Sequence, residues 1–324
     1  MSELRSHIRG VGGYLPQRVL TNQDLAAMVE TSDDWIRERT GIRERHIAEE
    51  GELTSDIAVE ASRLALERAG IAPGEVDLIV LATTTPDQTF PATATAVQAK
   101  LATGEGAAFD VQAVCSGFLF ALATADSMLR QGLFRTALVI GAETFSRIID
   151  WSDRTTCVLF GDGGGAVVMQ AEAGAPGAGE GVIAHHVRTD GTKSGLLYVD
   201  GGVSSTRTIG HVRMQGNKVF KHAVANISSA VQAILDENGL GPDDIDWFVP
   251  HQANQRILDG VAKKLAIDED RVISTVAEHG NTSAASIPLA LNAAIEDHRV
   301  RPGQLILSEA MGGGFSWGAS LFRI

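Results

Sequence analysis

The stretch "AILDENGLGPDDIDWFVPH" (residues 233–251) decides the fold, because "ALERAGIAPGEVDLIVLA" (residues 65–82) repeats its pattern. The matched pairs, all 169 positions apart (239 minus 70, 249 minus 80), are Gly70 and Gly239, Pro73 and Pro242, Asp77 and Asp246, and Val80 and Val249. Each copy is typical of a helix that stops at Gly, a turn with Pro and acidic residues, and a buried strand. Four matches in equivalent roles at one offset predict a duplicated chain.

Apolar runs of strand length alternate with helical patterns through the rest of the chain. The expected strands are 77–84, 107–112, 136–142, 165–171, 246–251 and 304–311, and the expected helices are 55–70, 117–132, 218–239 and 255–267. This alternation predicts an α/β protein. We expect two halves, residues 1–172 and 173–324, joined by a linker or loop in the Gly- and Ala-rich stretch 171–181.

Composition narrows the class of protein. The net charge of −13 argues against nonspecific binding to nucleic acid or membranes. The sequence has no run of roughly eighteen apolar residues and no signal-peptide core, so we expect a cytoplasmic protein with no membrane partner. Two cysteines, Cys115 and Cys157, are too few for a disulfide framework or a four-thiolate zinc site, and we expect no metal.

Cys115 lies in "VQAVCSGFLFAL" (residues 111–122), directly before an expected helix. At a helix N-terminus the macrodipole lowers the pKa of a thiol and favours the thiolate, which is a nucleophile for acyl transfer. Cysteine is also a common core residue, and on the position of Cys115 alone the core role is favoured. Cys157 lacks a helix-start setting, and we assign it to the core.

Polar side chains follow the expected strands of the second half. His251 ends a buried strand, and Asn281 lies in a turn before another helix of small residues. Because ligand and catalytic groups gather at the carboxyl ends of strands, both are candidate site residues. His279 is a competitor, but its neighbours Glu278 and Gly280 predict an exposed turn.

Four motifs together resemble the β-ketoacyl-[acyl carrier protein] synthase III family of the thiolase superfamily: "AVCSGFLFAL", "VPHQANQRIL", "HGNTSAASIPLAL" and "EAMGGGFSWGASL". The resemblance extends over essentially the whole chain. It implies a thiolase-like duplicated α/β/α/β/α layered fold and a homodimeric acyltransferase. It also implies that no cofactor is needed, since acyl-CoA is a substrate.

The resemblance assigns catalytic roles. Cys115 attacks acetyl-CoA or another short acyl-CoA, and the backbone N–H groups of Cys115 and Gly313 form the oxyanion hole. His251 and Asn281 then bind the thioester oxygen of malonyl-acyl carrier protein and stabilise the enolate that forms when CO2 leaves. The carbanion attacks the acyl-cysteine and gives a 3-oxoacyl-acyl carrier protein, the first condensation of fatty-acid synthesis.

The resemblance also assigns binding residues. The CoA adenine stacks on Trp35 with Arg154 on its other side, and Thr31 and Arg39 make further CoA contacts. An acidic carrier protein needs a basic patch on this acidic chain. The expected patch consists of Lys221, Arg256, Lys263 and Lys264. The expected acyl-pocket residues are Phe90, reaching across the homodimer, and Met311, where well-known members have Phe.

Three alternatives stay open. The nearest is a paralogue with the same catalytic residues that primes a polyketide or quinolone-type product. A cysteine hydrolase using Cys115 and His251 is disfavoured by Asn281 and by the missing water-activating carboxylate. A catalytically silent carrier-protein-binding subunit is disfavoured because Cys115, His251 and Asn281 are all intact. The chain length and branching of the primer are not fixed by sequence.

Overall fold

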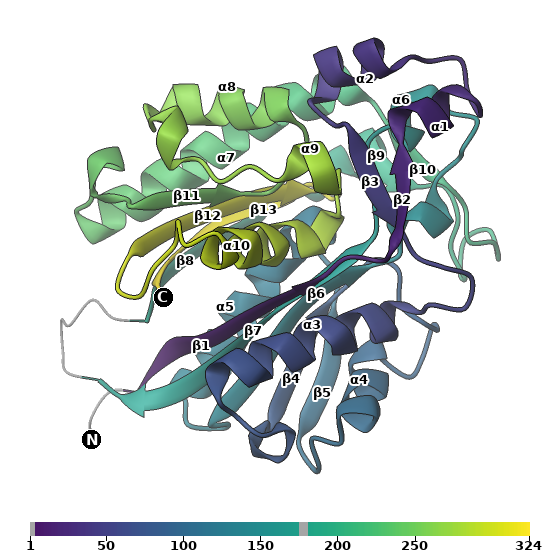
Figure 1. Cartoon of the computed structure of the whole chain (residues 1–324). Coiled ribbons are helices and arrows are strands. Elements are labelled where there is room, and N and C mark those ends of the chain that lie inside the picture. The colour runs from purple at the N-terminus through teal and green to yellow at the C-terminus, as the bar shows by residue number, and fades with distance from the viewer. Residues whose placement is uncertain (1–3, 175–180) are drawn as a thin grey trace.

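The computed structural model describes residues 4–174 and 181–324, which form two large sheets (Figure 1). The first sheet has the order β1 (Leu4–Tyr14), β7 (Gly163–Ala173), β6 (Thr136–Glu143), β4 (Leu78–Ala82) and β5 (Ala107–Val111). The second, taken from the corresponding edge, has the order β8 (Val182–Thr189), β13 (Ser316–Arg323), β12 (Leu305–Gly312) and β11 (Trp247–Pro250). In each sheet the second strand is antiparallel to both neighbours and the third and fourth strands are parallel. The two sheets therefore repeat one topology.

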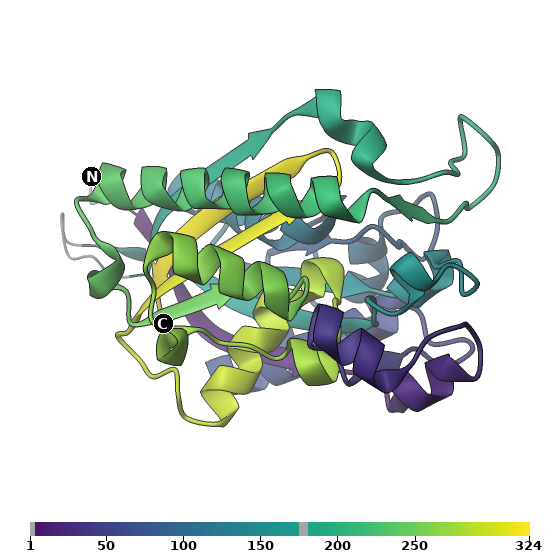
Figure 2. The ribbon, with the colours of Figure 1, turned by 90° about the horizontal axis from the view of Figure 1, so that it is seen from above.

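Helices cover both sheets on both faces. The helices are α3 (Thr54–Ala69), α4 (Thr93–Leu101), α5 (Gly117–Arg130), α7 (Gly216–Asn238), α8 (Gln255–Leu265) and α10 (Ser286–Glu296). Helices α5 and α10 lie between the sheets, with α3 and α4 outside the first sheet and α7 and α8 outside the second (Figure 1). Figure 2 shows α7 and α8 side by side over the second sheet. This is the thiolase-like α/β/α/β/α layering that the family resemblance implies.

The main core lies around the two inner helices. Phe118 and Leu122 of α5 and Ile287 and Leu291 of α10 are buried in one apolar cluster that also takes in Val80 of β4. A helix covered by a sheet on each side must be apolar over most of its circumference. This requirement explains the small and apolar residues that follow Cys115 and Asn281 in the sequence.

Smaller elements form a cap beside one end of α8, at the upper right of Figure 1. They are β2 (Arg18–Thr21), α1 (Asn22–Ala26), α2 (Asp33–Thr40), β3 (Glu44–Ile47), α6 (Arg154–Cys157), β9 (Leu197–Val199), β10 (Val212–Met214) and α9 (Val276–His279). The end of α2 packs tightly on α8, since a β carbon on Gly41 would lie 2.6 Å from the β carbon of Gln255. None of the helices in residues 4–174 and 181–324 combines the length and apolarity needed to cross a bilayer.

The repeated stretches have the same local structure. Gly70 ends α3 and Gly239 ends α7, each in the left-handed region with φ of 65°. Both stops are followed by a short 3-10 turn, η1 (Pro73–Glu75) and η5 (Pro242–Asp244). The shared glycine, proline and acidic positions therefore encode the same helix stop and turn.

The repeat extends beyond the stretches that reveal it in sequence. The 3-10 turns η2 (Val114–Ser116) and η7 (Ser283–Ala285) are also 169 positions apart (283 minus 114), as are the starts of α5 and α10 (286 minus 117). Val114 has φ of 50° and Ser283 has φ of 51°, so each turn begins with a left-handed residue that is not glycine. The turn that carries Cys115 thus has a counterpart that carries Ala284.

The ten predicted strands and helices all occur, each within two residues of its predicted bounds. The sequence pattern missed β1, β8 and β13, whose residues include glycines, histidines or serines among the apolar ones. The predicted linker at 171–181 is partly wrong, because residues 171–173 continue β7. Residues 175–180 of that linker lie outside the described residues.

Candidate active site

A pocket of about 260 Å³ brings together Cys115, His251 and Asn281. Cys115 lies in η2, His251 directly follows β11, and Asn281 lies two residues before η7. Helices α7 and α8 supply Ala223, Ile227 and Ile257 to the wall. The three residues are only 4%, 4% and 6% exposed, so reacting groups that reach them leave bulk water behind.

Cys115 lies in the short turn η2, directly before the start of α5 at Gly117. Burial raises the pKa of the Cys115 thiol to about 12. The expected lowering of this pKa is therefore wrong. A helix dipole contributes at most about 2 kcal/mol in favourable, partly buried positions, and removing a thiolate from water outweighs it here. Cys115 consequently rests as a neutral thiol.

The end of β12 lies directly against the Cys115 turn. A β carbon on Gly312 would come within 2.6 Å of the Cys115 backbone nitrogen and 3.0 Å of the Ala113 carbonyl oxygen. Gly313, the other expected oxyanion-hole residue, is also buried, and a β carbon there would lie 2.8 Å from the Leu197 carbonyl oxygen. Only glycine lets this strand end approach the turn so closely.

His251 directly follows β11 and is fixed at both its backbone and its ring. Its backbone N–H donates to the Glu309 carbonyl oxygen at 2.8 Å, continuing the pairing of β11 with β12. Its ring Nδ1 lies 2.6 Å from the Ser286 hydroxyl oxygen, at the first residue of α10. Burial lowers the pKa of His251 to about 3, so the imidazole is neutral at physiological pH.

Asn281 is held by neighbours on both sides of its peptide. Its backbone N–H donates to the Leu159 carbonyl at 2.9 Å, and its own carbonyl accepts from Gly161 N–H at 3.1 Å. The Ser283 N–H donates to the side-chain oxygen Oδ1 at 2.9 Å. Because Oδ1 accepts this bond, the Nδ2 amino group is the end of the side chain left for a ligand. Asn281 can thus donate a hydrogen bond inside the pocket.

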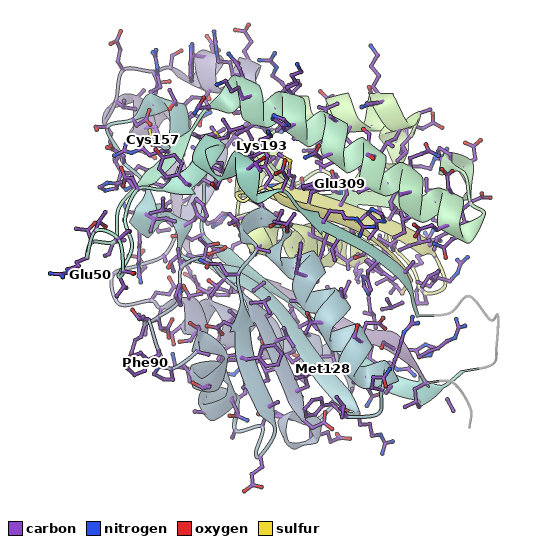
Figure 3. All side chains as sticks on the ribbon, turned by 180° about the vertical axis from the view of Figure 1, so that it is seen from behind. Glu50, Phe90, Met128, Cys157, Lys193 and Glu309 are labelled. Atoms are coloured by element: carbon purple, nitrogen blue, oxygen red, sulfur yellow. The ribbon has the colours of Figure 1, made fainter. Side chains whose placement is uncertain are left out.

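Glu309 is a pocket residue that the sequence reasoning missed. It lies in β12, is 1% exposed, and its Oε2 is buried without a hydrogen-bond partner. Burial raises the pKa of Glu309 to about 8. Figure 3 shows it inside the second half of the molecule, behind the outer helices. A single acidic residue within the apolar run "LILSEAM" was the available signal, since buried acids cluster at functional sites.

Two sequence assignments outside the catalytic set have different outcomes. The prediction that His279 lies in an exposed turn is wrong, because the residue ends the short helix α9 and is half-buried. Burial lowers the pKa of His279 to about 4. Cys157 is fully buried in an apolar cluster, as expected. Within the described part of the chain, no three His, Cys, Asp or Glu side chains are grouped to hold a metal ion.

The expected CoA residues gather on the cap. The guanidinium carbon of Arg39 lies 4.5 Å from the centre of the Trp35 ring, and that of Arg154 lies 4.8 Å from it. Arg154 also donates to the Glu30 carbonyl at 2.9 Å. Thr31 is half-buried on the adjoining segment. Arg39 lines the pocket and is exposed, which places this cluster at the pocket mouth.

The four expected basic residues are all exposed, on two neighbouring helices. Lys221 lies on α7, whereas Arg256, Lys263 and Lys264 lie on α8. Arg256 also lines the pocket. The two helices pack against each other, and the Lys264 ammonium on α8 lies 3.5 Å from the Val224 carbonyl oxygen of α7.

The two expected acyl-pocket residues lie in different places. Met311 lines the pocket and is 6% exposed. Phe90 is 81% exposed and lies at the outer edge of the first half, well away from Glu309 (Figure 3). Within a single chain, Phe90 is therefore not part of this pocket.

Comparison with known proteins places this chain in a family. Residues 109–191 match the family described as 3-oxoacyl-[acyl-carrier-protein (ACP)] synthase III, and residues 235–324 match its C-terminal family. A curated relative from Hyphomonas neptunium, named beta-ketoacyl-[acyl-carrier-protein] synthase III, is 74% identical over 99% of both chains.

Solved structures agree. The 3-oxoacyl-[acyl-carrier-protein] synthase III of Aquifex aeolicus VF5 is 45% identical with a TM-score of 0.92, over 98% of this chain and 100% of the other. The priming β-ketosynthase of the R1128 polyketide pathway is 34% identical with a TM-score of 0.93, and the match covers 100% of this chain and 98% of the other. The chain therefore belongs to the β-ketoacyl-[acyl-carrier-protein] synthase III family.

Proposed function

We propose that Cys115, His251 and Asn281 perform the condensation with which this family starts fatty-acid synthesis. The acyl donor is acetyl-CoA or another short acyl-CoA, and the extender is malonyl-acyl carrier protein. The polyketide-priming alternative is not favoured, because the relative at 74% identity is named beta-ketoacyl-[acyl-carrier-protein] synthase III, whereas the polyketide-priming enzyme is 34% identical. The residues 1–172 and 173–324 are the proposed units of the duplication.

In the first half-reaction the Cys115 sulfur attacks the acyl-CoA thioester carbon. The C–S bond to CoA breaks, and the thiol proton of Cys115 passes to the departing CoA sulfur, so no net charge is left. The backbone N–H groups of Cys115 and Gly313 stabilise the tetrahedral oxyanion. The tight contact between Gly312 and the Cys115 turn supports this assignment, because it sets the position of Gly313 relative to Cys115. One such donor contributes roughly 3–4 kcal/mol to lowering the barrier.

In the second half-reaction the thioester oxygen of malonyl-acyl carrier protein accepts hydrogen bonds from His251 and Asn281. Loss of CO2 leaves the electron pair as an enolate on that oxygen, and the two donors stabilise it. The enolate carbon attacks the acyl-Cys115 carbon, and the departing Cys115 sulfur takes a proton from water. The observation that carries the proposal is that Asn281 and a neutral His251 share one buried pocket with Cys115.

Residues at the pocket mouth and on the outer surface bind CoA and the carrier protein. Trp35, Arg39, Arg154 and Thr31 hold the nucleotide end of CoA, and the patch of Lys221, Arg256, Lys263 and Lys264 docks the acidic carrier protein. No cofactor takes part. The enzyme acts as a homodimer in the cytoplasm, where thiols stay reduced. The high exposure of Phe90 supports a partner-facing position for that ring.

Intact-mass measurement tests the nucleophile and the primer together. The protein is incubated separately with acetyl-CoA and with longer or branched acyl-CoAs. We expect one acyl group to be added to the wild type and to Cys157→Ala, and none to Cys115→Ala. Acylation of Cys115→Ala to the same extent would remove Cys115 from the mechanism. Loading by longer acyl-CoAs alone would contradict the short-chain primer.

A further inference from the structure

The ring of His251 has a buried partner outside the three catalytic residues. Ser286 is the first residue of α10 and is 1% exposed. Its hydroxyl oxygen lies 2.6 Å from His251 Nδ1 and 3.4 Å from the backbone nitrogen of Gln252. The Ser286 hydroxyl therefore bridges the imidazole and the peptide that follows it.

We propose that Ser286 is a positioning residue that fixes the tautomer of His251, with the proton on Nε2. This inference rests on the proposed function, in which His251 donates a hydrogen bond to the malonyl thioester oxygen. It concerns the condensation step alone and assigns Ser286 no contact with substrate.

Counting donors around the hydroxyl gives the direction of the bond. The Gln252 N–H can only donate, so the Ser286 oxygen accepts that bond, and among the described residues His251 Nδ1 is the acceptor within reach of the hydroxyl's own proton. A neutral imidazole carries one N–H, and an Nδ1 that accepts from Ser286 leaves this proton on Nε2. Burial keeps His251 neutral, with its pKa lowered to about 3, so a doubly protonated ring does not compete.

The tautomer decides what His251 can do in the pocket. With a proton on Nε2, the ring donates to the thioester oxygen before and after CO2 leaves. With a proton on Nδ1, a bare Nε2 lone pair would face the enolate oxygen and repel it. In this tautomer Nε2 already carries a proton, so it cannot accept the proton of the Cys115 thiol. The acyl-transfer half-reaction therefore does not depend on Ser286. The inference therefore predicts that loss of Ser286 affects the two half-reactions unequally.

The backbone around His251 is also held by hydrogen bonds that do not involve Ser286. Gln252 donates through its side chain to the carbonyls of Pro250 at 2.8 Å and Ile273 at 3.1 Å, and its Oε1 accepts from Thr275 N–H at 2.7 Å. These bonds anchor Gln252, the residue after His251, to Pro250 and to residues 273–275. Removal of the Ser286 hydroxyl should therefore change the protonation of the ring without moving it out of the pocket.

The test compares Ser286→Ala, Ser286→Thr and the control Ser62→Ala. Ser62 is a fully buried serine of α3 whose hydroxyl donates to the Ala58 carbonyl at 2.6 Å, far from the pocket lining. Loading of Cys115 by acetyl-CoA is followed by intact mass, and discharge of the acetyl-enzyme by malonyl-acyl carrier protein is followed by quenched flow. The ring nitrogens of His251 are followed by 15N NMR, assigned by their absence in His251→Ala.

We expect Ser286→Ala to load at the wild-type rate and to discharge roughly 100-fold more slowly, as when one oxyanion donor is lost. Ser286→Thr should recover most of the discharge rate, and Ser62→Ala should match wild type in both steps. The wild-type spectrum should show an unprotonated Nδ1, with an Nδ1–H population appearing in Ser286→Ala. An Nδ1–H in wild type, or equal slowing of both steps in Ser286→Ala, would overturn the inference. Failure of wild type to load any acyl group would instead overturn the proposed function, and the NMR result is independent of activity.

Discussion

Gly312 and Cys115 are in direct backbone contact, because a β carbon on Gly312 would lie 2.6 Å from the Cys115 nitrogen. The neighbouring atom is backbone and cannot swing aside as a flexible side chain would. The position of the nucleophile in the first half thus depends on a glycine at the end of a strand in the second half. Gly312 and Cys115, which are 197 positions apart in the chain (312 minus 115), meet at this contact.

Gly312→Ala should slow acylation of Cys115 by at least about 100-fold, since displacement of a reacting group by roughly 1 Å has that effect. The measurement is the rate of acetyl transfer from acetyl-CoA, followed by intact mass. Gly74→Ala is the matched control, because a β carbon at Gly74 would meet nothing within 4 Å. Wild-type acylation in Gly312→Ala would show that the contact does not position Cys115.

Glu309 should make stability depend on pH. Its pKa is about 8 in the folded chain against an ordinary 4.5, so between these values the folded state keeps a proton that the unfolded state has released. The free energy of unfolding should therefore fall as pH rises through this window, by up to about 1.4 kcal/mol per pH unit from this group. Urea denaturation from pH 5 to 8 measures it, with Glu309→Gln as the neutral isostere. Parallel pH curves for the two proteins would contradict the buried, protonated carboxyl.

Lys263→Glu should raise the KM for malonyl-acyl carrier protein and leave the KM for acetyl-CoA unchanged. Lys263 is exposed on α8, the helix that supplies Arg256 and Ile257 to the pocket, and under the proposed function it attracts the acidic carrier protein over long range. We expect about a tenfold effect at low salt that shrinks as salt screens the charges. Arg63→Glu, on the outer helix α3, controls for a change of net charge. An equal change in both KM values would exclude a docking role.

Trp35→Ala should raise the KM for acetyl-CoA and leave the KM for malonyl-acyl carrier protein unchanged. Loss of an aromatic surface for a stacked base costs about 1–3 kcal/mol, so the KM for acetyl-CoA should rise about 10-fold or more while that for malonyl-acyl carrier protein stays the same. Steady-state kinetics with each substrate varied in turn separates the two. A normal KM for acetyl-CoA would remove Trp35 from the CoA site.

The fold could be predicted from sequence because its signals are local. The Gly70 and Gly239 helix stops, the Pro turns and the uninterrupted apolar strands each report on a few neighbouring residues. The repeat then supplied the long-range organisation. β13 was missed because its serines, Ser316 and Ser320, are buried between neighbouring strands and read as loop residues in isolation.

The chemistry of the pocket was only partly predictable. Cys115, His251 and Asn281 carry recognisable motifs, but the pKa of Cys115 depends on burial by distant segments, which no local pattern reports. Ser286 has no sequence signal, because its role comes from the ring that α10 brings against it.

The duplication explains why each half supplies different groups. The positions 169 before His251, Asn281 and Ala284 are Ala82, Gln112 and Cys115 (251 minus 169, 281 minus 169, 284 minus 169). Equivalent turns thus carry the nucleophile in one half and a small residue in the other. The polar side chains of His251 and Asn281, which share the pocket with Cys115, both come from the second half. A symmetric scaffold therefore forms one asymmetric site.

The division of labour between the halves is tested most directly by mass spectrometry of the acetyl-enzyme after malonyl-acyl carrier protein is added. Wild type should lose the acetyl group from Cys115 and release acetoacetyl-acyl carrier protein. His251→Ala and Asn281→Ala should become acetylated and remain so, with discharge slowed by roughly 100- to 1000-fold. Discharge of either variant at the wild-type rate would contradict the account, because the enolate would then form without the donors of the second half.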